Sequence, residues 1–491
     1  MVWFKIALAV IWAVVWGVYI YICDARERGR KPVKGRLYLQ SPHPLGTVLL
    51  FVLTFCLSFW YGKQVTAKFL QILTPMLLCF AVYYTLLVAL IPVLRRFISA
   101  RACSCLWGVP NSVILLYITT RISNYMTKSL VIRLPISISE ATGKVLLSIW
   151  LAGFVAILAW SILSHLIFRR QLLKDAKLVP LDSPVRAVWY RQLDLGHFEA
   201  VPFRLMTSPR VKTPLSIGLF DKTTCVVLPE KDYTPEELAL LLRHELVHIA
   251  RWDSCNKLTM TLCTAMFWFN PFMWIAMRQS ADDMELSCDE TVLLGYQERT
   301  RRDYANLLLQ TAADQRGFTT CLSASASALR YRLKNVIAPR KRFIGGVVVG
   351  IIVCVFALTC IFADISFEQG TLAEDFFQKQ ELQQVHSLVI TLVVDDEISH
   401  YKAYDQENQQ AIVSYLSGLQ ISSITGIYDL WEMNPHTQID IESATGNYRL
   451  IVTEEYLSAQ RAGEGAVYYH LDTPIDWDYL IPLIRNGTPY R

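Results

Sequence analysis

Several stretches of this chain are apolar and nearly uncharged over about the length of a membrane-spanning helix. A bilayer core requires about 20 such residues per helix. Hydrophobic residues make up 53% of the 491 positions and charged residues 18%, against about 25% charged in an ordinary soluble protein. We therefore predict a mainly α-helical membrane protein with about six transmembrane helices, near residues 2–22, 45–60, 69–94, 106–120, 145–168 and 343–363.

The basic residues between these stretches predict which loops face the cytoplasm. Lys and Arg gather on the cytoplasmic side of short loops, and here they cluster at 26–36, 95–101, 169–177 and 340–342. The second and third clusters both mark cytoplasmic ends, so one more crossing is required between them. The weaker stretch 106–120 is counted as a span for this reason.

Four regions follow from this topology. They are a membrane bundle at 1–168, a cytoplasmic domain at 169–342, a final span at 343–363 and an extracellular domain at 364–491. The N-terminus is then outside. The alternative for the first stretch is a cleaved signal peptide, which is disfavoured because the apolar run is long and no small-residue cleavage site precedes the basic loop.

The C-terminal region carries a charge opposite to that of the rest of the chain. Residues 364–491 have a net charge of −14 and residues 1–363 a net charge of +19. An acidic surface disfavours anionic lipids and nucleic acids, and this region contains no cysteine, so no disulfide can form within it. Its sequence predicts a small α+β domain with a helix at 406–419 and strands at 386–394, 437–441, 448–452 and 466–471.

The segment His244-Glu245-Leu-Val-His248 is the pattern that carries chemistry. Histidines four residues apart lie on one face of a helix and can hold one zinc ion. Glu245 can then take a proton from a bound water. A helix start is marked by Thr234-Pro235 and by Glu237 at the capping-box position. The alternative is a helix with two surface histidines.

A zinc ion held by two histidines needs a third protein ligand, commonly a glutamate from a later helix. We predict Glu285 as this ligand, and Asp289, one helical turn later, as a carboxylate that orients a ligand histidine. Cys288 is expected to face away from Glu285 and to serve packing. The alternative for the acidic segment 282–290 is a solvated helix face.

Residues 258–277 are nearly all apolar but are not counted as a span. If they crossed the membrane, His248 and Glu285 would lie on opposite sides and could not share a metal. Asn270-Pro271 also interrupts the run. We predict two helices joined there, either buried in the cytoplasmic domain or lying along the inner membrane face, where their aromatic residues would suit the interface.

These motifs together resemble the BlaR/MecR antirepressor family of bacterial integral-membrane zinc metallopeptidases. The resemblance covers about residues 70–363. It is carried by 244–248, by Glu285-Leu-x-Cys-Asp289 and by three shorter matches at Pro214–Phe220, Val226–Pro229 and Trp268–Pro271.

The resemblance implies a gluzincin-like domain of α+β structure that binds one Zn2+ per chain. Its ligands would be His244, His248 and Glu285, its general base Glu245, and Asp289 matches the family's acidic position. The strand ahead of Pro229 resembles the edge strand that aligns a substrate backbone by β-augmentation. The substrate-aligning residues would be Gly218, Leu219 and Phe220.

The chain departs from the best-known family members in its N-terminal and extracellular parts. It has two additional spans, at 2–22 and 45–60, and its outer domain is too short for a penicillin-binding sensor. Ser399-His-Tyr-Lys402 matches one nucleophile motif of such sensors, but the partner motifs are missing from the tail. The family also implies self-cleavage in the linker at 319–327, for which a plain linker is the alternative.

The expected function is a zinc-dependent endopeptidase of the bacterial cell membrane that takes part in signalling. Its substrate would be a cytoplasmic DNA-binding repressor of winged-helix type, its own linker, or both, in response to an unidentified external ligand or partner. Membrane lipid is an expected partner, a homodimer is allowed, and direct nucleic-acid binding is not expected. The alternatives are a non-catalytic receptor or scaffold and a protease that processes membrane proteins.

Overall fold

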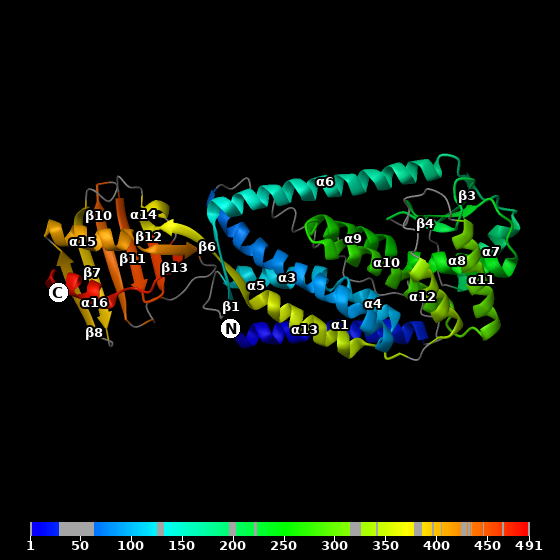
Figure 1. Ribbon diagram of the computed structural model, residues 1–491, viewed down its shortest axis with the longest axis horizontal. Coiled ribbons are helices and arrows are strands. Elements are labelled where there is room, and N and C mark those ends of the chain that lie inside the picture. Colours follow the sequence, from blue (N-terminus) through cyan, green and yellow to red (C-terminus); the bar gives the residue numbers. More distant parts are fainter. Residues whose placement is uncertain are drawn as a thin grey trace.

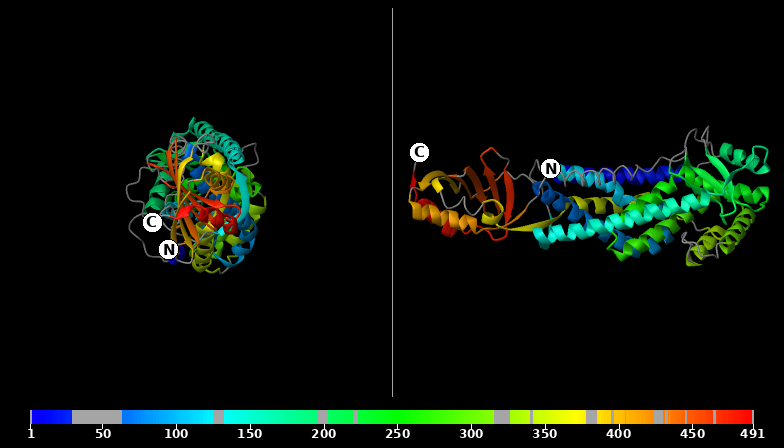
Figure 2. Two further views of the ribbon diagram at one scale, coloured as in Figure 1. Left: turned by 90° about the vertical axis from the view of Figure 1, so that its left-hand side faces the viewer. Right: turned by 90° about the horizontal axis from the view of Figure 1, so that it is seen from above.

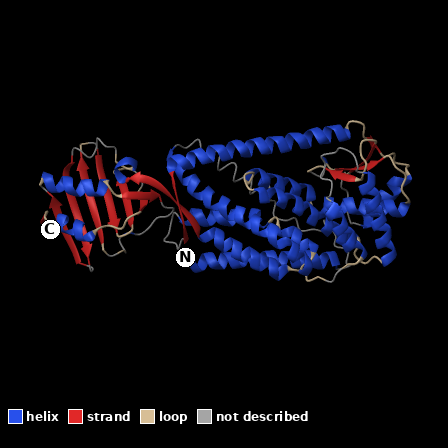
Figure 3. Ribbon diagram, in the orientation of Figure 1, coloured by secondary structure: helices blue, strands red, loops and turns tan. Residues whose placement is uncertain are grey.

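The computed structural model describes residues 2–28, 63–124, 132–195, 203–219, 223–314, 326–339, 342–377 and 385–489, with short gaps inside the last range at 395–396, 404, 424–429, 431–432, 434, 445 and 464–465. The molecule is elongated (Figure 1). A β-rich domain lies at one end, long helices run through the middle, and a smaller α/β region lies at the other end. The right-hand view of Figure 2 and the colouring in Figure 3 show the same order.

Three described helices are long and apolar enough to cross a membrane. Their apolar segments are Trp3–Cys23, Leu73–Phe97 and Val145–Leu173. They belong to α1 (Val2–Arg28), α3 (Lys63–Phe97) and α6 (Glu140–Leu173).

The remaining expected spans are shorter or lie outside the described residues. The final span is α13 (Gly346–Phe362), an apolar helix of 17 residues. The stretch 106–120 is divided between α4 (Ala100–Leu106) and α5 (Val109–Asn124). Residues 45–60 fall outside the described part. The structure therefore supports a mainly helical membrane protein, while the number six stays a prediction.

Helices α1 and α13 run antiparallel and touch through glycine. A Cβ atom at Gly17 would lie 3.0 Å from the Gly346 carbonyl oxygen, and one at Gly346 would lie 2.7 Å from the Gly17 carbonyl oxygen. One turn further along, a Cβ at Gly350 would lie 3.2 Å from the Ala13 carbonyl oxygen. Small residues let membrane helices approach closely where lipid supplies no hydrophobic drive for association.

A helical hairpin from the middle of the sequence inserts among the membrane helices. It consists of α9 (Asp253–Met266) and α10 (Pro271–Val292), joined at Asn270, which caps α10 by accepting a hydrogen bond from the Phe272 amide. The predicted break at Asn270-Pro271 is confirmed.

The hairpin lies neither inside the α/β domain nor along a membrane face, the two positions that the sequence predicts. Its tip is hydrogen-bonded to two membrane helices: Asn270 Nδ2 donates to the Ala81 carbonyl of α3 (3.3 Å), and Trp150 Nε1 of α6 donates to the Met266 carbonyl (2.7 Å). Figure 1 shows α9 and α10 between α6 and α3. The turn can lie at this depth because its polar groups find partners in the protein, as irregular backbone away from water requires.

The α/β region at the far end contains a four-stranded sheet in the order β2-β3-β5-β4. Strands β3 and β5 are parallel and the other pairs antiparallel. Leu238, Leu242 and Leu246 of α8 pack on this sheet against Val226 and Leu228. The elements of this region are β2 (Lys177–Leu178), α7 (Pro184–Leu195), β3 (Arg204–Ser208), β4 (Leu215–Ile217), β5 (Cys225–Pro229), α8 (Pro235–Ala250), α11 (Glu298–Asp314) and α12 (Ala326–Ile337).

The C-terminal domain is an antiparallel sheet with α15 and α16 on one face, as Figure 1 shows. The predicted helix and four predicted strands are present as α15, β7, β10, β11 and β13, and further elements complete the domain. Its bounds are α14 (Leu372–Asp375), β7 (Val385–Val394), β8 (Glu397–Ala403), α15 (Gln406–Ser417), β9 (Gln420–Ser423), β10 (His436–Ser443), β11 (Gly446–Thr453), β12 (Tyr456–Arg461), β13 (Val467–Leu471), α16 (Trp477–Arg485) and β14 (Thr488–Pro489).

Two strands extend this sheet to the membrane helices. Strand β6 (Ala363–Thr371) follows α13 without a break and pairs with β9 of the C-terminal domain. Strand β1 (Ile132–Ser139) pairs in parallel with β6 and leads directly into α6. The C-terminal domain is thus joined to two apolar helices by continuous backbone pairing.

The contact between α6 and the hairpin gives a first prediction. A Cβ atom at Gly153 would lie 2.2 Å from the Trp268 ring, which is held in place by a hydrogen bond from its Nε1 to the Trp150 carbonyl. We expect Gly153→Ala to lower the free energy of unfolding by about 1–3 kcal/mol through overpacking. Thermal unfolding in detergent measures this loss.

The matched control for this prediction is Gly108→Ala, whose added Cβ meets nothing closer than 3.5 Å. Adding Trp268→Leu to Gly153→Ala should recover part of the lost stability. Equal stability of the Gly153 variant and the wild type would show that the hairpin does not pack on α6 in this way.

Candidate metal centre

Helix α8 carries three of the predicted site residues and begins where the sequence indicates. Thr234 Oγ1 accepts a hydrogen bond from the Glu237 amide (3.3 Å), and Glu237 Oε2 accepts one from the Thr234 amide (3.0 Å). This reciprocal capping box fixes the first turn. Leu238, Leu242 and Leu246 anchor one face of α8 on the sheet. Glu245 and His248, about three and four helical turns after Thr234, are buried.

Three donor groups converge between α8 and α10. The Nε2 atoms of His244 and His248 lie 3.1 Å apart. One oxygen of Glu285 lies 3.5 Å from His244 Nε2, and the other lies 3.6 Å from His248 Nε2. The structure therefore brings the three predicted ligands together from two helices.

These separations fit a tetrahedral metal ion. Bonds of about 2.1 Å from zinc to nitrogen or oxygen place neighbouring donor atoms about 3.4 Å apart in a tetrahedron. The 3.1 Å separation of the two histidine nitrogens is close to one such edge, and the two Glu285 oxygens lie 3.5 and 3.6 Å away, one from each nitrogen. Histidine and carboxylate donors are also the ligand types that zinc prefers.

Each histidine is held on its other ring nitrogen. His248 Nδ1 donates to Asp253 Oδ2 at 2.6 Å, and Asp253 is buried. Asp253 can reach back to α8 because Trp252 takes the left-handed conformation (φ 57°) at the turn between α8 and α9. A non-glycine residue in this region stores about 1–3 kcal/mol of strain. Such carboxylate–histidine pairs set the tautomer and orientation of metal-binding imidazoles.

The partner of His244 is a tyrosine supported by the predicted aspartate. His244 Nδ1 lies 2.9 Å from the Tyr304 hydroxyl, which donates to Asp289 Oδ1 at 2.7 Å. Asp289 Oδ1 itself is 3.6 Å from His244 Nδ1. The contact predicted between Asp289 and a ligand histidine is therefore made mainly through Tyr304, while its role stays a prediction.

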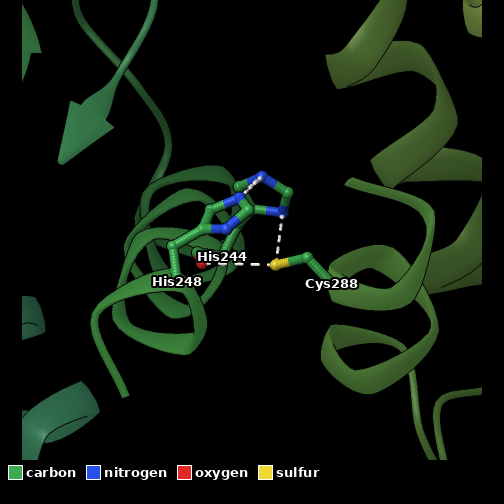
Figure 4. Close-up of side chains that lie close together, drawn as sticks. All are labelled: His244, His248 and Cys288. Carbon is green, nitrogen blue, oxygen red and sulfur yellow. Dashed lines mark hydrogen bonds between the residues drawn. The ribbon is translucent and has the colours of Figure 1, made fainter. Parts of the chain in front are cut away.

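The expectation that Cys288 faces away from the site is wrong. Its Sγ atom lies 3.4 Å from His244 Nδ1, and its donor atom and those of both histidines lie within 4.8 Å of one another. Figure 4 shows the three side chains pointing toward each other. The physical reason is that helix positions three apart, such as 285 and 288, are neighbours on one face. Cys288 is also fully buried, so its expected packing role holds in part.

The cluster favours positive charge at its centre. Burial lowers the pKa of His244, but Cys288 and Glu285 outweigh burial and raise that pKa to about 10. Burial raises the pKa of Glu285, yet the positive charge of His248 and hydrogen bonds from both histidines hold it well below its usual range. The donor types and the separations of their atoms are what fit a divalent cation between the two helices.

The edge strand beside α8 is β4, rather than the strand before Pro229. The latter is β5, which is paired on both sides and buried throughout. Gly218 follows β4 with φ 135°, and an added Cβ there would meet the Thr224 backbone at 2.5 Å. Leu219 comes next, and Phe220 lies outside the described residues. The substrate-aligning role of these residues stays a prediction.

Three residues of the site were missed by sequence reasoning. Asp253 had a local signal, since it lies five residues after His248 at the next helix start. Tyr304 and Arg332 had none, because they come from α11 and α12 and reach the site only through tertiary packing. Arg332 contacts both predicted carboxylates.

The fold and the site indicate a class of protein: a mainly helical membrane protein in which an α/β region carries an H-E-x-x-H helix that could hold a metal ion. Residues 135–336 match the family described as BlaR1 peptidase M56. The chain is also 25% identical, over 211 residues, to "Regulatory protein BlaR1" of Bacillus licheniformis. Over these residues the chain is similar to BlaR/MecR-type membrane metallopeptidases.

The match to the Bacillus protein is partial. It covers 40% of this chain and 33% of the relative, so the chain spans about a third of that protein's length. The matched family region contains every residue of the site described above, from His244 to Arg332. It ends before α13 and includes none of the C-terminal domain.

The donor set generates a prediction that separates Glu285 from Cys288 as the third ligand. We expect the cobalt-substituted protein to lack an intense sulfur-to-cobalt charge-transfer band, because Cys288 approaches His244 from the Nδ1 side and Glu285 from the Nε2 side. Cys288→Ser should retain cobalt and Glu285→Gln should bind it much more weakly. A near-ultraviolet band that disappears in Cys288→Ser would show sulfur ligation instead.

The Asp253–His248 pair gives a second prediction for the site. We expect Asp253→Asn to weaken zinc affinity by about 10–100-fold, the usual cost of removing a carboxylate that orients a ligand histidine. Competition with a chromophoric chelator measures the affinity. Asp232→Asn is the control, since Asp232 is exposed in the same region. Unchanged affinity in the Asp253 variant would contradict the proposed role of the pair.

Proposed function

We propose that this protein is a membrane-embedded zinc metalloendopeptidase that acts in transmembrane signalling. The observation that carries the proposal is the convergence of donor atoms of His244, His248 and Glu285, at separations of 3.1, 3.5 and 3.6 Å, with Glu245 buried one residue after His244. A purely structural site would need no acid at the position of Glu245. The proposed substrate is a cytoplasmic DNA-binding repressor, the protein's own linker, or both.

The proposed mechanism assigns metal binding, proton transfer and substrate alignment to different residues of the chain. His244, His248 and Glu285 would hold the zinc ion, which when bound supplies Lewis-acid activation of water and of the scissile carbonyl. Glu245 takes the proton from the attacking water and passes it to the leaving amine. Asp253 and the Tyr304–Asp289 pair keep the histidine rings oriented. Strand β4 offers an open edge on which a substrate backbone can pair.

The direction of signalling follows from the distribution of charge. Basic clusters at 26–36, 95–101, 169–177 and 340–342 favour a cytoplasmic position for the site, and the acidic domain then lies outside. Strands β6 and β1 would connect that domain to α13 and α6. We therefore propose a bacterial cell-membrane protein in which an external ligand or partner, recognised by residues 364–491, controls the protease.

The test of catalysis is Glu245→Gln. We expect it to retain zinc and to lower the cleavage rate by at least about 100-fold, because a general base contributes about that factor or more. Proteomic comparison of cells with wild-type and variant protein should reveal a cytoplasmic fragment that disappears. Glu236→Gln, at an exposed position in the first turn of the same helix, is the control. An unchanged fragment in cells with the Glu245 variant would exclude the mechanism and favour a receptor that does not itself cleave the substrate.

A further inference from the structure

Arg332, from a helix other than α8 and α10, forms ion pairs with both Glu285 and Asp289. Arg332 of α12 donates from Nε to Asp289 Oδ2 (2.7 Å) and from Nη2 to Asp289 Oδ1 (2.8 Å). Its Nη1 lies 3.4 Å from Glu285 Oε2. Lys257 also approaches Glu285, at 3.8 Å, but its side chain is half exposed. Arg332 is therefore the more enclosed of the two cations.

The geometry of this contact uses properties specific to arginine. A planar guanidinium can bind one carboxylate through two parallel hydrogen bonds and still present a further N–H to a second group. Here the two bonds go to Asp289, which supports Tyr304 and through it His244. The remaining donor faces Glu285. The Arg332 side chain thus contacts one proposed ligand, Glu285, directly. It supports a second ligand, His244, through Asp289 and Tyr304.

The helix that carries Arg332 is also contacted by a residue at the end of α3 and by a residue just before α13. The Arg95 guanidinium, at the end of α3, lies 5.8 Å from the centre of the Tyr331 ring. Arg342, four residues before α13, donates to Asn335 and to the Tyr331 hydroxyl, and it pairs with Glu290 of α10. Figure 1 shows α12 beside α10 at this end of the helical body.

We propose that Arg332 is a positioning residue through which α12 couples the membrane helices to the metal centre. With α12 docked, Arg332 fixes the carboxylate of Glu285 and the Asp289–Tyr304–His244 chain. A movement of α13 relative to α3 that shifts α12 would withdraw Arg332, release Glu285 and loosen His244. This inference rests on the proposed metal centre and adds a way in which an outside event changes it.

The test compares three variants of the full-length protein in detergent. Arg332→Ala removes the contact, Arg332→Lys keeps a positive charge but loses the paired hydrogen bonds, and Arg330→Ala is the control. Arg330 lies on the exposed side of the same helix. Zinc affinity is measured by chelator competition, and coordination geometry by the visible spectrum of the cobalt-substituted protein.

We expect Arg332→Ala to weaken zinc affinity about 10–100-fold and to alter the cobalt spectrum, as loss of an outer contact to metal ligands usually does. Arg332→Lys should give an intermediate affinity and spectrum, and Arg330→Ala should match the wild type. A folded Arg332→Ala protein with wild-type affinity and spectrum would overturn the inference. If Arg332→Ala does not fold, an unchanged spectrum in Arg332→Lys would overturn it equally.

The same experiment separates this inference from the proposed function. Absence of zinc and cobalt binding in both the wild type and Arg330→Ala would contradict the metal centre itself. Metal binding in those two proteins, with no difference in the Arg332 variants, would leave the metal centre intact and reject only the coupling through α12.

Discussion

The position of α10 is the constraint on which the rest of the structure depends. Its Asp283 is completely buried and accepts hydrogen bonds from Arg95 (2.6 Å) and Trp107 (2.8 Å) at the ends of α3 and α4. Breaking a buried ion pair leaves an uncompensated charge and is strongly destabilising, so this contact ties α10 to the membrane helices. The opposite side of α10 presents Glu285 and Asp289 to α8. A metal centre at this place therefore cannot be independent of the membrane bundle.

The same dependence extends toward the C-terminal domain. The tip of the α9–α10 hairpin lies against α3 and α6, and α6 begins immediately after β1, which pairs with β6. Strand β6 continues into the C-terminal sheet and starts where α13 ends. The proposed signal thus has a contiguous physical route, made of paired strands, two apolar helices and the hairpin.

Local features of the site could be predicted from the sequence because they follow from helix periodicity. His244 and His248 share a face at a spacing of four, the capping box at Thr234 starts their helix, and Asn270 starts the next one. The prediction that Cys288 faces away from Glu285 is wrong because helix positions three apart lie on the same face. Tyr304 and Arg332 lay beyond such reasoning, since a spacing of 60 or more residues from His244 says nothing about distance in space.

The sequence by itself determined the apolar segments, the charge difference between the two ends and the candidate donor residues, because hydrophobicity, charge and helical spacing are local properties. Only the tertiary structure decided that the apolar run at 258–277 lies among the membrane helices and that β6 and β1 join the C-terminal sheet to them. It alone brought α12 onto the candidate metal centre. These arrangements depend on which buried polar groups find partners across the fold, and that pairing is settled only when all elements pack together.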